Sequence, residues 1–230
     1  MTETHDKATY HYNLGVQYER NNDSDNALRE YENSLKADPS FPYPYKSIGE
    51  ILFKSGNLSE ALKHMKKALE LDPDWIEALG VSADIYYEIG DLEKAIPMLE
   101  RALQGDPGNL HYNSQLGRML IAEKRYDEAI NLLNNALKMD PDNYKFHYHL
   151  GVAYGKRGIT DIDRSIEHWQ NTARLKKNDP AVLKNLSISY FTRGYMDKAT
   201  ETFKKVLELD PSDEVAIKFL EFSETASKRD

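Results

Sequence analysis

Cysteine is absent from this chain of 230 residues, which excludes disulfide bonds and thiol chemistry. Long apolar stretches are also missing, and none approaches the roughly 20 residues that a helix needs to span a bilayer. The first seven residues have neither the basic start nor the apolar core of a signal peptide, so we expect a cytoplasmic protein. Positive charge is in deficit. The net charge of −8 at pH 7 argues against general nucleic-acid binding, because phosphate contacts favour a basic face.

What the sequence has instead is a period of 34 residues. Glycine, proline and alanine each recur at this spacing, in three columns: Gly15, Gly49, Gly117 and Gly151; Pro39, Pro73, Pro107 and Pro141; Ala27, Ala61, Ala95 and Ala129. The spacing shifts once, because Ser165 and Ala199 continue the alanine column after a single step of 36 residues. A fixed period of this length indicates stacked supersecondary units rather than one globular core.

Each repeat has the pattern of two helices. In the second repeat Tyr45, Ile48 and Leu52 lie at helical spacing, and Gly56 then interrupts the pattern. A second periodic segment follows and stops at Pro73, because proline disfavours a helical residue before it and cannot donate to the next turn. The same order of helix and turn recurs along the chain, which predicts an all-α fold.

These columns resemble the tetratricopeptide repeat. That family's signature is a bulky residue, then Leu-Gly three positions on, then Tyr, Ala, Phe, Ala and Pro. The first repeat matches it with His11, Leu14, Gly15, Tyr18, Ala27, Tyr31, Ser34 and Pro39. The resemblance implies an α-solenoid superhelix of six helix-turn-helix repeats and a C-terminal capping helix. We assign these columns to packing, and expect the glycines to let two helix backbones cross closely.

The repeat register sets the expected boundaries. We expect an N-terminal tail over 1–7, then the repeats, then a capping helix and tail over 214–230. The six repeats span 8–41, 42–75, 76–109, 110–143, 144–179 and 180–213. The fifth repeat departs from the others, because 159–163 lengthens its turn and Lys177 replaces the proline stop. We therefore expect its second helix to run on toward Asn178.

Catalysis is not supported by the residues. His147 and His149 are two apart on a predicted helix, which points them to different faces and makes them poor metal ligands as a pair. Asp161 and Asp163 are explained more simply as a helix start than as a cation site. The chain has no phosphate-cradling glycine loop and no nucleophile elbow. We predict a protein that is not an enzyme and uses no cofactor or metal.

The resemblance implies that the first helix of each repeat faces a concave groove, where the family binds extended peptides or partner helices. The groove positions of repeats one to three are Tyr12, Glu19, Tyr43, Lys46, Glu50, Phe53, Glu77, Asp84, Tyr87 and Glu88. Those of repeats four to six are His111, Ser114, Arg118, Ile121, Lys145, Tyr148, Lys156, Lys184, Ile188 and Phe191.

The sign of charge changes along this set, from mainly acidic in the first half to basic in the second. A random spread of surface charge would explain so small a sample equally well. Aromatic residues between the charges favour a peptide interface, since such interfaces use aromatic anchors with a charged surround. We predict an adaptor or scaffold for a protein or peptide partner, without membrane insertion. The carboxylate clamp of co-chaperone repeats is not present, because Glu50 stands where the clamp that starts at Lys46 needs asparagine.

Self-assembly is the alternative function. The final helix carries an extra apolar row of Val215, Phe219, Phe222 and Ala226 beside Ile217 and Leu220. If that row stays exposed it is a candidate contact between copies, because exposed apolar patches usually mark interfaces. If both rows wrap the last repeat, no such contact remains.

Overall fold

The computed structural model describes residues 3–227, and over that range it contains helices and no strand. The predicted all-α class is confirmed. The first helices in the chain are α1 (Glu3–Arg20), α2 (Ser24–Ala37), α3 (Pro42–Lys54), α4 (Leu58–Leu71), α5 (Ile76–Ile89) and α6 (Leu92–Gly105). They are followed by α7 (Leu110–Ala122), α8 (Tyr126–Met139), α9 (Tyr144–Arg157), α10 (Ile162–Leu175), α11 (Pro180–Arg193), α12 (Met196–Leu209) and α13 (Glu214–Ser227).

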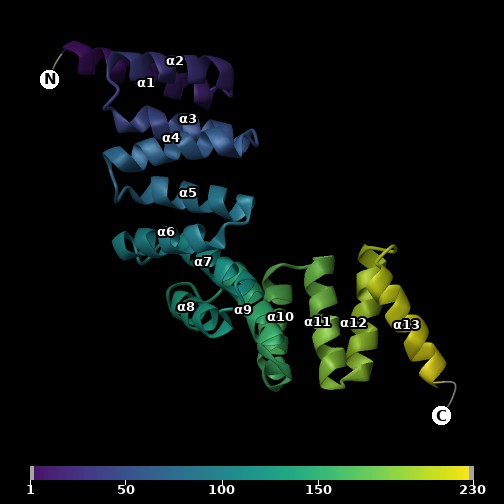
Figure 1. Cartoon of the computed structure of the whole chain (residues 1–230). Coiled ribbons are helices and arrows are strands. Elements are labelled where there is room, and N and C mark those ends of the chain that lie inside the picture. The colour runs from purple at the N-terminus through teal and green to yellow at the C-terminus, as the bar shows by residue number, and fades with distance from the viewer. Residues whose placement is uncertain (1–2, 228–230) are drawn as a thin grey trace. The chain divides into compact units, whose positions relative to one another are not determined.

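The chain divides into two compact units, one up to residue 112 and one from residue 113 onward. In the first unit α1 pairs with α2, α3 with α4 and α5 with α6, and each pair also packs on the next (Figure 1). In the second unit the same sequential packing runs from α8 through α9, α10, α11 and α12 to α13. Sequential packing of hairpins is the arrangement that a fixed repeat period predicts.

Local sequence fixes where the helices begin and end. Asp91 accepts the backbone N–H of Lys94 at 3.2 Å and caps α6, and Asp179 caps α11 in the same way. Gly90 and Gly194 end α5 and α11 in the left-handed region, with φ of 88° and 86°. Most second helices end at an aspartate whose N–H bonds to the carbonyl four residues earlier, as Asp72 does to Ala68 at 2.9 Å.

The glycine column makes room for side chains. A Cβ at Gly15 would lie 2.6 Å from the Tyr31 ring, and one at Gly151 would lie 2.8 Å from Trp169. At Gly117 the nearest atoms likewise belong to a side chain, that of Leu133. At Gly49 a Cβ would lie 2.7 Å from the Met65 side chain and 3.3 Å from the backbone oxygen of Ala61. The glycines therefore let the facing helix approach closely and leave space for one of its large side chains.

Two boundaries differ from the prediction. Helix α1 begins at Glu3, so the expected tail is helical from that residue, and His5 bonds to Asp38 at 3.1 Å there. Helix α10 ends at Leu175 and does not reach Asn178, so that expectation was wrong. The C-cap of α10 is Lys176, whose N–H bonds to the carbonyl of Thr172 at 2.7 Å, and Asn178 adopts φ of 58° in the turn that follows, a left-handed conformation that asparagine tolerates.

The insertion in the fifth repeat forms a short 3₁₀ helix, Ile159–Asp161, after Gly158. Arg157 fixes it, because its guanidinium donates to both carboxylate oxygens of Asp161, at 2.8 and 2.7 Å. The turn between α9 and α10 is therefore lengthened and also held in one conformation.

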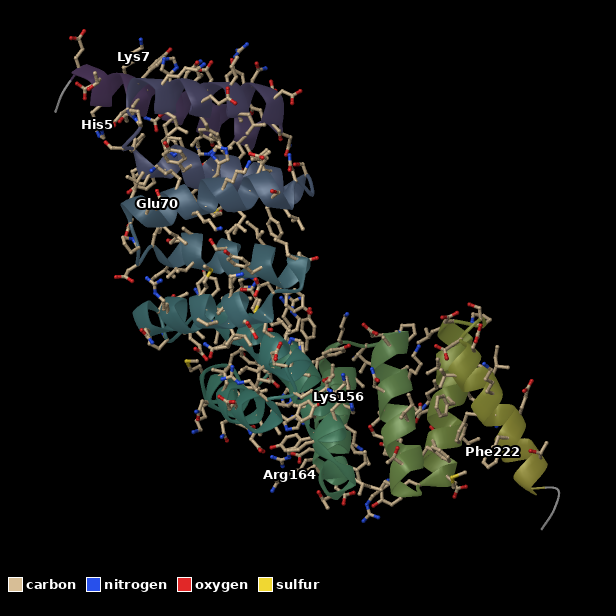
Figure 2. All side chains as sticks on the ribbon, viewed as in Figure 1. His5, Lys7, Glu70, Lys156, Arg164 and Phe222 are labelled. Carbon is tan, nitrogen blue, oxygen red and sulfur yellow. The ribbon has the colours of Figure 1, made fainter. Side chains whose placement is uncertain are left out.

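Helix α13 packs on the second unit through Ala216 and Phe219, which are buried. The Phe219 ring lies 4.4 Å from that of Phe203 and 5.3 Å from that of Phe191. Phe219 therefore cannot form the contact between copies for which its row was a candidate, because this side of α13 faces α11 and α12. Val215 is exposed, and so is Phe222, which is labelled in Figure 2. The side chain of Ala226 lies outside what the structure describes.

Candidate peptide-binding surfaces

In the first unit an aromatic cluster joins the middle of α1 to the starts of α3 and α5. Ring centroids lie 5.5 Å apart for Tyr12 and Phe41, 5.3 Å for Phe41 and Tyr43, and 5.2 Å for Tyr43 and Trp75. Tyr12 and Tyr43 were predicted groove residues, and the structure brings them together. Phe41 and Trp75 were missed. They are 34 residues apart, so the repeat lattice itself carried the signal.

The predicted acidic residues of the first unit are partly neutralised. Glu19 accepts a hydrogen bond from the Tyr31 hydroxyl at 2.8 Å and lies 3.5 Å from the Lys54 ammonium. Glu50 pairs with Lys46 at 2.8 Å. The remaining acidic residues of the predicted set, Glu77, Asp84 and Glu88, lie on α5.

On α5, Glu77 and Glu88 are exposed and form no ion pair with any residue in 3–227, while Asp84 and Tyr87 are half-buried. Burial raises the pKa of the Tyr112 hydroxyl, and Glu77 and Asp84 add to that rise. The carboxylates of Glu77 and Asp84 therefore act on the Tyr112 hydroxyl.

The predicted basic residues of the second unit have different surroundings. Lys145 and Lys156 are exposed, and neither forms an ion pair within the described range. Arg118 is half-buried. Burial lowers the pKa of His149 to about 4, and the positive charges of Arg118 and Lys145 contribute. Arg118 and Lys145 therefore both act on the ring of His149.

Lys184 is less available than the sequence indicates. Its ammonium lies 2.7 Å from the buried carboxylate of Asp213, which also accepts the backbone N–H groups of Val215 and Ala216 at the start of α13. This lysine attaches the last helix to α11. Its replacement would report on stability as much as on binding, so it is a poor probe of the surface.

The predicted aromatic and apolar residues divide between core and surface. Tyr12, Phe53 and Tyr148 are half-buried and pack partly on the cores. Ser114 and Ile121 are buried, so these two predicted groove positions offer little surface to a ligand. Tyr43, Ile188 and Phe191 are exposed at 48%, 40% and 44%. His111 is exposed as well.

Two clefts border the first helices. One of about 360 Å³ lies in the first unit and is lined by Glu19, Asn22, Ser24, Ile51, Lys54 and Ser55. One of about 240 Å³ lies between α9 and α11 in the second unit and is lined in part by Val152, Gly155, Lys156 and Ile188. Lys156 and Ile188, which are predicted groove positions of two successive first helices, both line the second cleft.

No group of three or more His, Cys, Asp or Glu residues that could hold a metal ion occurs in 3–227. The buried ring of His147 uses both nitrogens internally, with Nδ1 2.9 Å from His168 and Nε2 3.0 Å from the carbonyl of Pro141. Among the helices described, none has the length and apolar character that crossing a membrane requires.

Family models match most of the chain. One described as "TPR repeat" matches 117–158, and three described as "Tetratricopeptide repeat" match 12–75, 52–119 with 86–131, and 184–213. No curated protein is similar enough to match.

Several solved structures share the fold. YrrB, described as a TPR protein with an unusual peptide-binding site, is 20% identical, with a TM-score of 0.70 over 82% of this chain and 96% of its own. MamA from Desulfovibrio magneticus RS-1 is 22% identical, with a TM-score of 0.70 over 75% and 97%. PilF of Pseudomonas aeruginosa is 16% identical, with a TM-score of 0.74 over 97% and 100%. At these identities the similarity shows the fold, an α-solenoid of helical hairpins.

Proposed function

Since the chain belongs to the tetratricopeptide repeat family, we propose that it is a non-catalytic protein-interaction adaptor whose first helices bind extended peptides. On this proposal the surface formed by α1, α3 and α5 prefers a basic segment. The surface of the second unit, formed by α9 and α11, prefers an acidic one. The observation that carries the proposal is the pair of exposed lysines, Lys145 and Lys156, which have no partner carboxylate in the described part of the chain.

Exposed apolar groups stand next to this charge. Ile188 and Phe191 lie on α11, which packs beside α10 and shares a cleft with α9. Aromatic and aliphatic anchors surrounded by charge are typical of peptide interfaces, and the peptide-binding site described for YrrB, a protein of the same fold, supports this assignment. With about 3.3 Å per extended residue and roughly 10 Å between helix layers, each repeat would contact about three ligand residues.

Charge reversal on this surface is the test. We expect Lys145→Glu with Lys156→Glu to weaken binding of a labelled, extended peptide rich in Glu, Asp and Leu by at least about tenfold, because two attractive contacts become repulsive. Fluorescence anisotropy at low and high salt measures the affinity, and wild-type binding should weaken as salt rises.

The matched control is Lys138→Glu with Lys204→Glu, which makes the same change in net charge on exposed positions of the second helices α8 and α12. This control should bind within about twofold of the wild type. Equal losses in the two double variants would mean that net charge alone governs binding, and the proposed surface would be wrong.

Self-assembly remains a second candidate because Val215 and Phe222 are exposed at 45% and 56% on the last helix. Two apolar groups on one helix can seed a contact between copies. If they do, Phe222→Ser with Val215→Ser should shift a concentration-dependent oligomer to monomer in light scattering. A wild-type protein that stays monomeric across the concentration series would exclude this alternative. The control variant is Ile217→Ser, because Ile217 is half-buried on the same helix.

A further inference from the structure

Gly155 is an exception among the first helices. The equivalent position in the other five repeats carries a side chain, in Glu19, Phe53, Tyr87, Ile121 and Phe191. In α9 the position is exposed and has none. The cleft between α9 and α11 includes this position, so the missing side chain coincides with open space.

The cleft has an apolar base. Ile162 and Trp169, which are buried, form its floor from α10, and Val152 and Ile188 line it from α9 and α11. Its volume of about 240 Å³ is below the range of roughly 300–1,000 Å³ that is usual for small-molecule sites. That size suits a single large side chain.

The polar residues of the lining use donor groups in hydrogen bonds to backbone carbonyls of the protein itself. Ser165 donates to the carbonyl of Gly151 at 2.8 Å, and Thr192 donates to that of Ile188 at 2.8 Å. Ser189 and Asn185 also donate to carbonyls of their own helix, each at 2.9 Å. Because the three hydroxyl donors and one N–H of Asn185 are already used, a polar group that enters the cleft loses water without full replacement, whereas an apolar group loses nothing.

Lys156 supplies the only charge among the described residues that line the cleft, and it is labelled in Figure 2 near the end of α9. We propose that this cleft is a specificity pocket that holds one large apolar side chain, such as Leu, Met or Phe, of an acidic extended peptide. Lys156 pairs with a carboxylate that flanks the inserted residue. This inference rests on the proposed function and names the ligand class of the same surface.

The probe is a labelled peptide of about ten residues with a single Leu among Glu and Asp, compared with the same peptide carrying Ala or Ser at that position. Wild-type protein should bind the Leu peptide at least about tenfold more tightly than the Ala peptide, since leucine has three more carbon atoms and each contributes up to about fourfold when it is fully buried. The Ser peptide should bind no better than the Ala peptide.

Gly155→Phe fills the cleft with the residue that α11 carries at this position. It should reduce binding of the Leu peptide to the level of the Ala peptide while leaving the Ala peptide unchanged. Gly155→Ala is the matched control, because its Cβ meets only the Ser165 hydroxyl, at 3.1 Å, and it should keep the Leu preference. Circular dichroism checks that both variants are folded.

The outcomes separate the two proposals. If all three peptides bind with equal affinity and Lys145→Glu with Lys156→Glu abolishes that binding, the pocket is overturned and the acidic-peptide surface stands. If none of the peptides binds the wild type, both are overturned. If Gly155→Phe does not fold, equal affinities of the Leu and Ala peptides for the wild type would by themselves disprove the pocket.

Discussion

Replacement of Gly151 by valine is expected to lower the free energy of unfolding of the second unit by about 3 kcal/mol. A Cβ at this position would lie 2.8 and 2.9 Å from two carbon atoms of the Trp169 indole, and valine adds two more methyl groups. Trp169 is 3% exposed and its ring contacts Tyr148 at 5.0 Å, so it cannot swing away into solvent. Helices α9 and α10 must therefore separate or repack.

A double-mutant cycle tests whether this contact is the cause. Trp169→Leu alone should cost about 2 kcal/mol, because a smaller residue leaves a cavity. Combined with Gly151→Val it should cost less than the two single losses together by at least about 1 kcal/mol, since leucine gives the valine room. Urea unfolding followed by circular dichroism measures each value.

The control in the same helix is Gly155→Ala. Its added methyl meets a single hydroxyl and alanine favours a helix over glycine by about 1 kcal/mol, so its stability should be equal to the wild type or higher. Strict additivity in the cycle would show that Gly151 and Trp169 act independently and would contradict the packing role assigned to the glycine column.

The sequence was sufficient to predict features that depend on local chemistry. Proline, glycine and aspartate act within one turn of the residue itself, so the ends of most helices follow from the 34-residue lattice. The end of α10 shows where this reasoning stops, because Lys176 and Lys177 stand where the other second helices have Asp-Pro, and the helix still ends at Leu175.

Contacts between repeats were harder to predict from the sequence than the ends of helices. The ion pair of Lys184 with Asp213 spans 29 residues and that of Glu19 with Lys54 spans 35. Whether a long side chain points to solvent or to the next hairpin depends on rotamers that periodicity does not specify. These pairs changed the candidate site most, because they remove charge from residues predicted to offer it.

The cleft at Gly155 needed both kinds of information. The lattice identifies the position as one that carries a side chain in the other five repeats. Only the structure shows that neighbouring side chains leave the space open and that Trp169 forms its floor. A glycine in a column of large residues is thus a signal worth following in other repeat proteins.

Mild acid is expected to destabilise the second unit through two half-buried histidines, His149 and His168. Burial, with a further contribution from His147, lowers the pKa of His168 to about 4, and burial lowers that of His149 to about 4 as well. The His168 ring stacks on Tyr154 at 5.5 Å, and the guanidinium groups of Arg157 and Arg164 lie over the same tyrosine. Adding a proton there would place a third cation at this tyrosine.

The sign follows from the two states. In the unfolded chain each histidine titrates near 6.5, so below that pH the unfolded state binds more protons than the folded state and stability falls. The loss develops between pH 6.5 and about 4 and is constant below that window. Each histidine should account for up to about 2 kcal/mol by pH 5.

Urea unfolding at pH 7, 6 and 5 tests this expectation on wild type, His168→Gln and His111→Gln. Glutamine keeps a polar side chain but does not titrate. The unfolding free energy of His168→Gln should therefore fall less steeply between pH 6 and 5 than that of the wild type, by the contribution of about one proton. His111 is exposed and serves as the matched control, whose pH dependence should equal that of the wild type. Carboxylates such as Glu30, whose pKa is lowered chiefly by its hydrogen bond to His11, contribute in the same direction only below about pH 4.5, outside the measured range. Identical pH profiles for all three proteins would mean that His168 takes up its proton as readily in the folded state as in the unfolded one, and the half-buried histidines would not govern acid stability.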